Sequence, residues 1–158
     1  MPLSTTCATP RGSKLFYLLD INVLIASADP AHQFHDVFKR WYVDRKKPAL
    51  ATCPITENGF LRIYGHPDYP GGPGSPVLAL APLSAIRNRP DSVFLPDDVS
   101  LTDPAKRNAL KSATPKQLTD IYLLSLAVRH NGMFVSFDRG IRANWVEQGN
   151  RAFELLAP

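Results

Sequence analysis

The feature that most constrains this fold is the apolar run LFYLL, residues 15–19, which ends at the carboxylate of Asp20. The run is continuously apolar rather than alternating, a pattern typical of a strand buried on both faces of a parallel sheet. Further apolar residues, Val23, Leu24 and Ile25, follow soon after the acid. A carboxylate among apolar residues is costly unless a partner compensates for its lost hydration, and a metal ion is one such partner.

The rest of the chain alternates further strands with helices. We expect strands at residues 49–52, 92–95, 133–137 and 152–156. Helices are expected to begin at Asn22, at Pro30 after an Asp29 N-cap, at Pro54, at Val77 and at the capping box Thr114–Gln117, the last running to His130 with Gly132 as its stop. Strands that alternate with helices favour a mainly parallel sheet covered on both faces.

Length and composition set broad limits. At 158 residues the chain suits one domain, which we place at residues 15–158 after a flexible tail at residues 1–14. Its 18 basic and 14 acidic residues give a net charge of +4, which permits a polyanionic partner without requiring one. No stretch suits a membrane span or a signal peptide, so we expect a cytoplasmic protein. The two cysteines, Cys7 and Cys53, are too few for a disulfide framework.

Four acids occupy positions from which they could reach one site. Asp20 and Asp138 each follow a buried strand directly, and the carboxyl ends of parallel strands meet at one edge of a sheet. Glu57 lies in the first turn of the helix after the second strand, and Asp120 interrupts an otherwise apolar helix. Converging carboxylates repel one another without a divalent cation, and oxygen ligands alone favour Mg²⁺ or Mn²⁺ over zinc.

The tripeptide Leu-Thr-Asp occurs twice, ending at Asp103 and at Asp120. We assign the site residue to Asp120, because only this acid is followed by a sustained apolar helix that leads straight into the fourth strand. Asp103 lies in the Asp97–Ala113 segment, whose sequence fits no single element. The Gly65–Pro76 segment, rich in Gly and Pro, predicts a loop.

Most candidate residues also have a purely structural explanation, and Asp120 is the hardest to explain in this way. Asp20 is a good N-cap, Glu57 in a first helical turn is stabilised by the helix dipole, and Asp138 suits a turn. The pair His32 and His35 fits a solvated helix face better than a metal site. Three arginines near the predicted site are either solvated charges or contacts for RNA phosphates: Arg129, Arg139 and Arg142.

Four motifs together resemble one known family. The segments LLDINVL, TCPITENGFLRI, LTDIYLLSLAVRHNG and MFVSFDRGI carry the four acids in the order of the PIN domain, and specifically of the VapC ribonuclease toxins of bacterial toxin–antitoxin pairs. The resemblance covers residues 15–156. It implies a three-layer α/β/α fold with a mainly parallel five-stranded sheet in the order 3-2-1-4-5. This order would bring Asp20 next to Asp138.

The resemblance also implies roles for individual residues and partners. The family's metal-binding quartet matches four acids: Asp20, Glu57, Asp120 and Asp138. The polar positions that orient such acids match two residues: Asn22 and Ser136. The implied activity is Mg²⁺- or Mn²⁺-dependent hydrolysis of RNA, with Glu57 as a second-site or outer-shell ligand, and the implied partners are a small VapB-like antitoxin and a second copy of the chain. The chain departs from the commonest pattern in its Gly65–Pro76 loop and Asp97–Ala113 segment.

Two other functions stay open. The run DINVL nearly spells the nucleophile motif DxDx(V/T) of haloacid-dehalogenase-type phosphatases, but Asn22 stands where that motif supplies a general acid, and an amide cannot do so. A PIN-like module that binds RNA or a partner without cleavage would be indicated by the loss of an acid. None of the four acids is missing.

Overall fold

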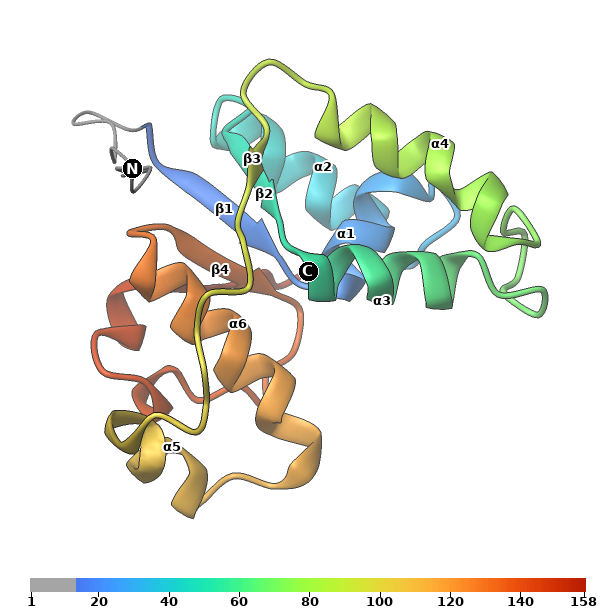
Figure 1. The fold of residues 1–158 in the computed structure, drawn as a ribbon. Helices are drawn as coiled ribbons and strands as arrows, with labels where there is room; N and C mark the ends of the chain where they lie inside the picture. Colours follow the sequence, from blue (N-terminus) through green and yellow to red (C-terminus); the bar gives the residue numbers. More distant parts are fainter. Residues whose placement is uncertain (1–13) are drawn as a thin grey trace, which may run out of the picture.

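The computed structural model describes residues 14–158, so Cys7 and nearly all of the predicted tail at residues 1–14 lie outside the described residues. Five parallel strands form one sheet in the order β3-β2-β1-β4-β5 (Figure 1), which confirms the predicted fold class and strand order. The strands are β1 (Phe16–Leu19), β2 (Ala49–Thr52), β3 (Val93–Phe94), β4 (Met133–Ser136) and β5 (Phe153–Leu155).

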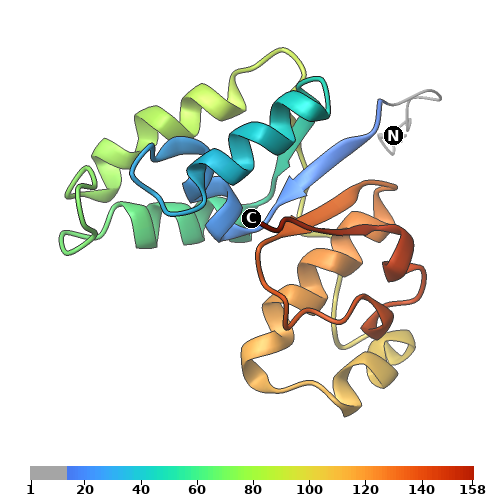
Figure 2. The ribbon, with the colours of Figure 1, turned by 180° about the vertical axis from the view of Figure 1, so that it is seen from behind.

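Helices cover both faces of this sheet. They are α1 (Ile21–Ala28), α2 (His35–Asp44), α3 (Pro54–Tyr64), α4 (Pro76–Arg87), α5 (Arg107–Lys111) and α6 (Leu118–Arg129). The first four lie together on one side, and α5 and α6 lie on the other, as Figures 1 and 2 show from opposite directions. Within residues 14–158 no helix combines the length and the apolar character that crossing a membrane requires.

Strand β1 divides its side chains between two cores. Tyr17 and Leu19 pack with α1 to α4, whereas Phe16 and Leu18 pack with α6. All four residues are buried, which is why the run is continuously apolar rather than alternating. The predicted strand began one residue earlier, at Leu15, but that side chain is 49% exposed.

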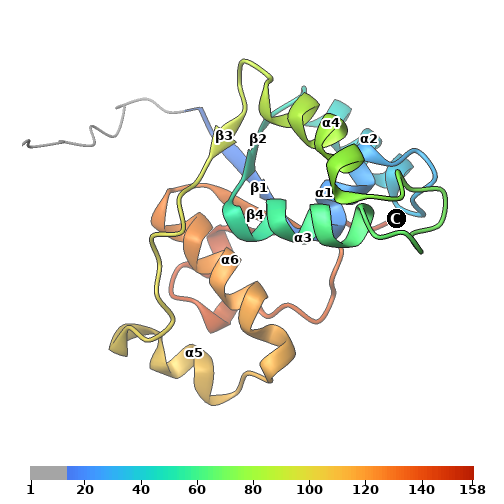
Figure 3. The ribbon, with the colours of Figure 1, turned by 45° about the vertical axis from the view of Figure 1, so that its right-hand side comes forward.

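The register of the sheet positions the site. Leu19 of β1 lies beside Val135 of β4, and the backbone N–H of Asp20 donates to the carbonyl of Val135 at 3.0 Å. The carboxyl ends of β1 and β4 are therefore level with each other. Figure 3 shows α6 and α3 beside this edge of the sheet, on either side of it.

The predicted start of the second helix is wrong. Helix α2 begins at His35, and Asp29 instead ends α1 by donating its backbone N–H to Ile25. The Asp29 carboxylate accepts hydrogen bonds from the backbone N–H of Ala31 at 2.9 Å and from the Tyr69 hydroxyl at 2.8 Å. The capping oxygens of Asp29 thus stabilise a turn, and one of them receives a donor from the Gly65–Pro76 loop.

The two histidines do not form the solvated helix face that we expected. His35 makes a 2.7 Å hydrogen bond between its Nδ1 and the Ala26 carbonyl, and His32 precedes α2 and accepts from the Phe34 N–H. Both side chains are half-buried. The side chain of His35 connects the start of α2 to α1, and that of His32 contacts the backbone of the turn before α2.

The remaining segments agree with the sequence in part. The capping box Thr114–Gln117 is present and opens a short 3-10 helix (Pro115–Gln117) that continues into α6. Asn131, with a φ of 57°, rather than Gly132, takes the left-handed conformation after this helix. A side chain at Gly132 would collide with the Phe16 ring. The Asp97–Ala113 segment contains a 3-10 helix (Pro104–Lys106) and α5.

Candidate active site

Asp20 is fixed at the carboxyl end of β1. It is the N-cap of α1, where its Oδ1 accepts from the Ile21 N–H at 2.7 Å, and its Oδ2 accepts from the Ser136 hydroxyl at 2.6 Å. The residue is only 9% exposed, and burial raises its pKa above the ordinary value, although both hydrogen bonds act in the opposite direction. Neutral donors therefore hold this carboxylate in place without neutralising its charge.

Asp20 and Asp138 lie near enough to Asp120 to influence its ionisation, and Asp138 also influences that of Asp20. Burial raises the pKa of Asp120 to about 7, and the negative charges of Asp20 and then Asp138 contribute to the rise. Asp138 is exposed, and its Oδ1 accepts from the Gly140 N–H at 2.7 Å, as in an Asx turn. We call these three acids, Asp20, Asp120 and Asp138, the aspartate cluster.

Glu57 has different surroundings. It lies in the first turn of α3, and its Oε1 accepts from the Thr52 hydroxyl at 2.7 Å and pairs with Nε of Arg87 at 3.0 Å. The contacts of this carboxylate are therefore with β2 and α4 rather than with the aspartate cluster. Sequence reasoning missed both partners, although Thr52 ends β2 in the way that Ser136 ends β4.

The two expected supporting residues differ in what they contact. Ser136 is buried, and its hydroxyl donates to Asp20 and accepts from the backbone N–H of Asp138 at 3.0 Å, so it joins two members of the aspartate cluster. Asn22 is exposed in the first turn of α1, and in the described part of the chain its side chain makes no hydrogen bond. Only Ser136 thus has an orienting contact in this structure.

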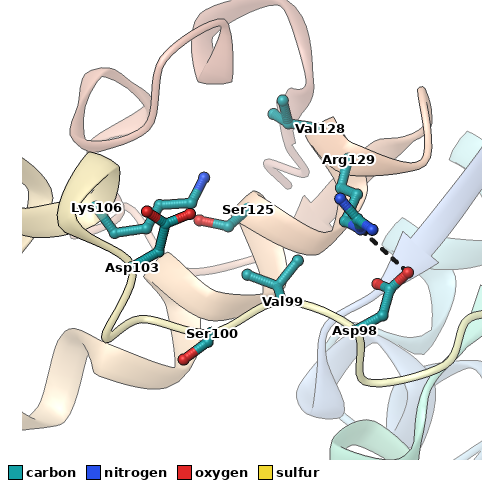
Figure 4. Close-up of a pocket in the computed structure, with 8 residues that line it drawn as sticks. All are labelled: Asp98, Val99, Ser100, Asp103, Lys106, Ser125, Val128 and Arg129. Carbon is teal, nitrogen blue, oxygen red and sulfur yellow. Dashed lines mark ion pairs between the residues drawn. The ribbon is translucent and has the colours of Figure 1, made fainter.

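The three arginines considered for RNA contact also differ. Arg129 forms an ion pair with Asp98 at 3.1 Å (Figure 4) and borders a pocket of about 340 Å³ between α6 and the segment that precedes α5. Arg139 and Arg142 are exposed, and no ion pair of theirs occurs among residues 14–158. Arg139 directly follows Asp138, so its charge is the one adjacent in sequence to the cluster.

Asp103, the alternative to Asp120, has contacts of a different kind. It is the N-cap of the 3-10 helix Pro104–Lys106, where its Oδ1 accepts from the Ala105 N–H at 3.0 Å, and it borders the same pocket as Arg129. In Figure 4 its side chain lies between Lys106 and Ser125. A capping role thus accounts for this acid.

The donor set of the aspartate cluster fits a hard divalent cation. The cluster supplies three carboxylates, and within residues 14–158 none of them pairs with Lys or Arg. Burial and mutual repulsion raise the pKa of Asp120, as expected of a site that lacks a compensating charge. In the described residues no three His, Cys, Asp or Glu side chains stand close enough to enclose an ion. The acids thus supply the ligand chemistry but are not drawn together.

The fold and these carboxylates define a class: a three-layer α/β protein of the PIN type with acids at the carboxyl edge of its sheet. No protein-family model matches the chain. Ribonuclease VapC44 of Mycobacterium tuberculosis is 39% identical over 124 residues, which cover 78% of this chain and 87% of the relative. Ribonuclease VapC38 of the same species is 36% identical over 139 residues, covering 88% and 96%, and ribonuclease VapC39 is 35% identical over 124 residues, covering 78% and 89%. The chain belongs to the VapC ribonuclease family.

Proposed function

We propose that this chain is an endoribonuclease that depends on Mg²⁺ or Mn²⁺ and is the toxin of a VapBC-type pair. Membership of the VapC ribonuclease family supports the reaction. The observation that carries the metal dependence is the aspartate cluster, in which burial and two neighbouring carboxylates raise the pKa of Asp120 to about 7. A site of this kind favours a divalent cation because the ion removes the repulsion.

In this proposal the residues have distinct tasks. Asp20 and Asp138 are the principal metal ligands, and Asp120 is a ligand or positions the attacking water. The Ser136 hydroxyl holds both, because it donates to the Asp20 carboxylate and accepts from the backbone N–H of Asp138. A bound divalent ion supplies a water of lowered pKa and offsets charge on the scissile phosphate and the leaving oxygen. Exposed Arg139 contacts a phosphate of the RNA strand.

The test compares single substitutions in a cleavage assay on total RNA. Wild type should cleave with Mg²⁺ or Mn²⁺ and be inactive in excess chelator. Asp120→Asn should abolish cleavage, while Asp103→Asn should keep it, because only Asp120 belongs to the aspartate cluster. Circular dichroism of each variant checks that the fold is intact. Cleavage by the Asp120→Asn variant, or in chelator, would refute the proposal.

The same preparation separates the two other functions considered for this sequence. A haloacid-dehalogenase-type phosphatase would hydrolyse p-nitrophenyl phosphate, a phosphate monoester, and leave RNA intact. A non-catalytic PIN-like module would retain labelled RNA in a binding assay without shortening it. We expect shortened RNA and no monoester hydrolysis.

We also propose two protein partners. The relatives carry the name VapC, and on this basis we expect a VapB-like antitoxin that blocks the site, together with a homodimer. Apolar side chains exposed on α4 support an interface on this helix: Val77, Leu78 and Leu80. Light scattering of the purified chain should give the mass of a dimer, and a monomer at micromolar concentration would refute this part.

A further inference from the structure

Glu57 is held by one of its two carboxylate oxygens. Oε1 accepts from the Thr52 hydroxyl at 2.7 Å and pairs with Nε of Arg87 at 3.0 Å, whereas no hydrogen bond to Oε2 occurs within residues 14–158. The Glu57 side chain is 15% exposed and that of Arg87 is 45% exposed. The carboxylate is thus fixed and partly buried, with one oxygen still available.

The position of Arg87 is itself supported. Arg87 is the last residue of α4, and its guanidinium lies over the ring of Phe94 in β3, 5.1 Å from the ring centre. Phe94 is the partner of Thr52 in the register between β2 and β3. The two groups that hold Glu57 therefore come from neighbouring elements, and the cation has a defined place beside β2 and β3.

In this arrangement Arg87 competes with a metal ion for the Glu57 carboxylate. Among the four acids of the predicted quartet, Glu57 is the one paired with a cation, and its contacts are with Thr52 and Arg87 rather than with the aspartate cluster. Glu57 can bind a metal ion with both oxygens, or turn toward the aspartate cluster, only if these contacts of Oε1 weaken. The free energy lost when the ion pair between Glu57 and Arg87 weakens then makes metal binding less favourable.

We propose that Arg87 is a positioning residue that, together with Thr52, holds Glu57 away from the aspartate cluster and thereby weakens divalent-cation binding. The inference rests on the proposed metal dependence, because it concerns the same site. Metal binding draws Glu57 from Arg87, and the chain without Arg87 binds the ion more tightly. An exposed or half-exposed ion pair contributes up to about 1 kcal/mol, which corresponds to roughly a fivefold change in the dissociation constant.

The experiment is calorimetric titration of the full chain with Mn²⁺, without RNA. Arg87→Met should bind Mn²⁺ about fivefold more tightly than wild type, and Arg87→Lys, which keeps the charge, should return toward wild type. In a Glu57→Gln background the same Arg87→Met change should have no effect, because its influence passes through that carboxylate. Thr52→Val, which removes only the hydroxyl donor, should tighten binding in the same direction and serves as a second variant if Arg87→Met folds poorly.

The matched control is Arg89→Met. Arg89 lies two residues beyond Arg87, pairs with Asp91 at 3.4 Å and lies over the Tyr42 ring, so its removal deletes an equal charge from the same region without touching Glu57. It should leave the Mn²⁺ affinity unchanged. Unchanged or weaker binding by Arg87→Met, or an equal gain in the Glu57→Gln background, overturns the role of Arg87 while leaving the metal site in place. A wild type that binds no Mn²⁺ overturns the proposed metal dependence, and this inference with it.

Discussion

Replacing Asp120 by Asn should stabilise the metal-free protein at alkaline pH. Asn keeps the shape of the side chain but removes a charge that the native state disfavours, since the pKa of Asp120 rises from 3.8 to about 7 on folding. The native protein therefore binds more protons than the unfolded chain between these values. Its stability falls as the pH rises through this window, and the loss is complete above pH 7.

The size of this effect on stability follows from the shift in the pKa of Asp120. Each pKa unit corresponds to about 1.36 kcal/mol, so a rise from 3.8 to about 7 corresponds to about 4 kcal/mol at pH 8. Partial exposure of Asp120 and its coupling to the other aspartates reduce this, and we expect about 2 kcal/mol. For a chain of this size that is an increase of about 4–8 °C in melting temperature. At pH 5 roughly a third of the difference should remain.

The assay is thermal melting in chelator at pH 5 and pH 8. Asp103→Asn is the control, because Asp103 caps a 3-10 helix outside the aspartate cluster and Asn is an equally good cap. This control should melt within about 1 °C of wild type at both pH values. If Asp120→Asn is no more stable than wild type at pH 8, or if its advantage is the same at pH 5, the repulsion inferred for the cluster is absent.

Three further outcomes are expected. Mg²⁺ at about 100 times its dissociation constant should raise the melting temperature of wild type by about 5–10 °C. The Asp20→Ala variant should lose most of this rise. A wild type whose melting temperature does not change with Mg²⁺ contradicts the metal site. Ser136→Ala removes the 2.6 Å donor to buried Asp20 and should lower the melting temperature by about 3–6 °C in chelator, whereas an unchanged melt would mean that this hydrogen bond does not hold the carboxylate. Tyr69→Phe leaves the Asp29 carboxylate with a single hydrogen-bond donor. It should lower the free energy of unfolding, measured in urea, by about 1–2 kcal/mol without changing its dependence on urea concentration. An unchanged free energy of unfolding would show that Tyr69 does not anchor the Gly65–Pro76 loop to Asp29.

Local signals in the sequence were enough for much of this fold. A continuously apolar strand followed by Asp predicted both the burial of β1 on two faces and the place of Asp20, because each depends on a few adjacent residues. The same holds for the capping box before α6, whereas the choice of Asp120 over Asp103 stays a prediction. The order of the strands came from the family resemblance and is confirmed by the structure.

Partners that are distant in the sequence were not predictable in this way. Asp29 is followed by Pro30 and carries the local pattern of an N-cap, yet Tyr69, 40 residues later, supplies a donor that favours a turn. Glu57 likewise has the position expected of a ligand, and nothing near it in the sequence indicates that Arg87 is its partner. A local pattern indicates which contacts a side chain can make, and tertiary packing decides among them.

The charges of the four acids bear on how many metal ions the site takes. Arg87 offsets the charge of Glu57, so among these four acids, within residues 14–158, only those of the aspartate cluster form no ion pair with a cation. With a pKa of about 7, the Asp120 carboxyl is about half protonated near neutral pH, which lowers the negative charge that a metal ion has to offset in this cluster. A second ion would require the charge of Glu57 as well, and hence separation of Glu57 from Arg87. We therefore expect one Mn²⁺ per chain in the wild-type titration without RNA, and any second binding event should be strengthened by Arg87→Met.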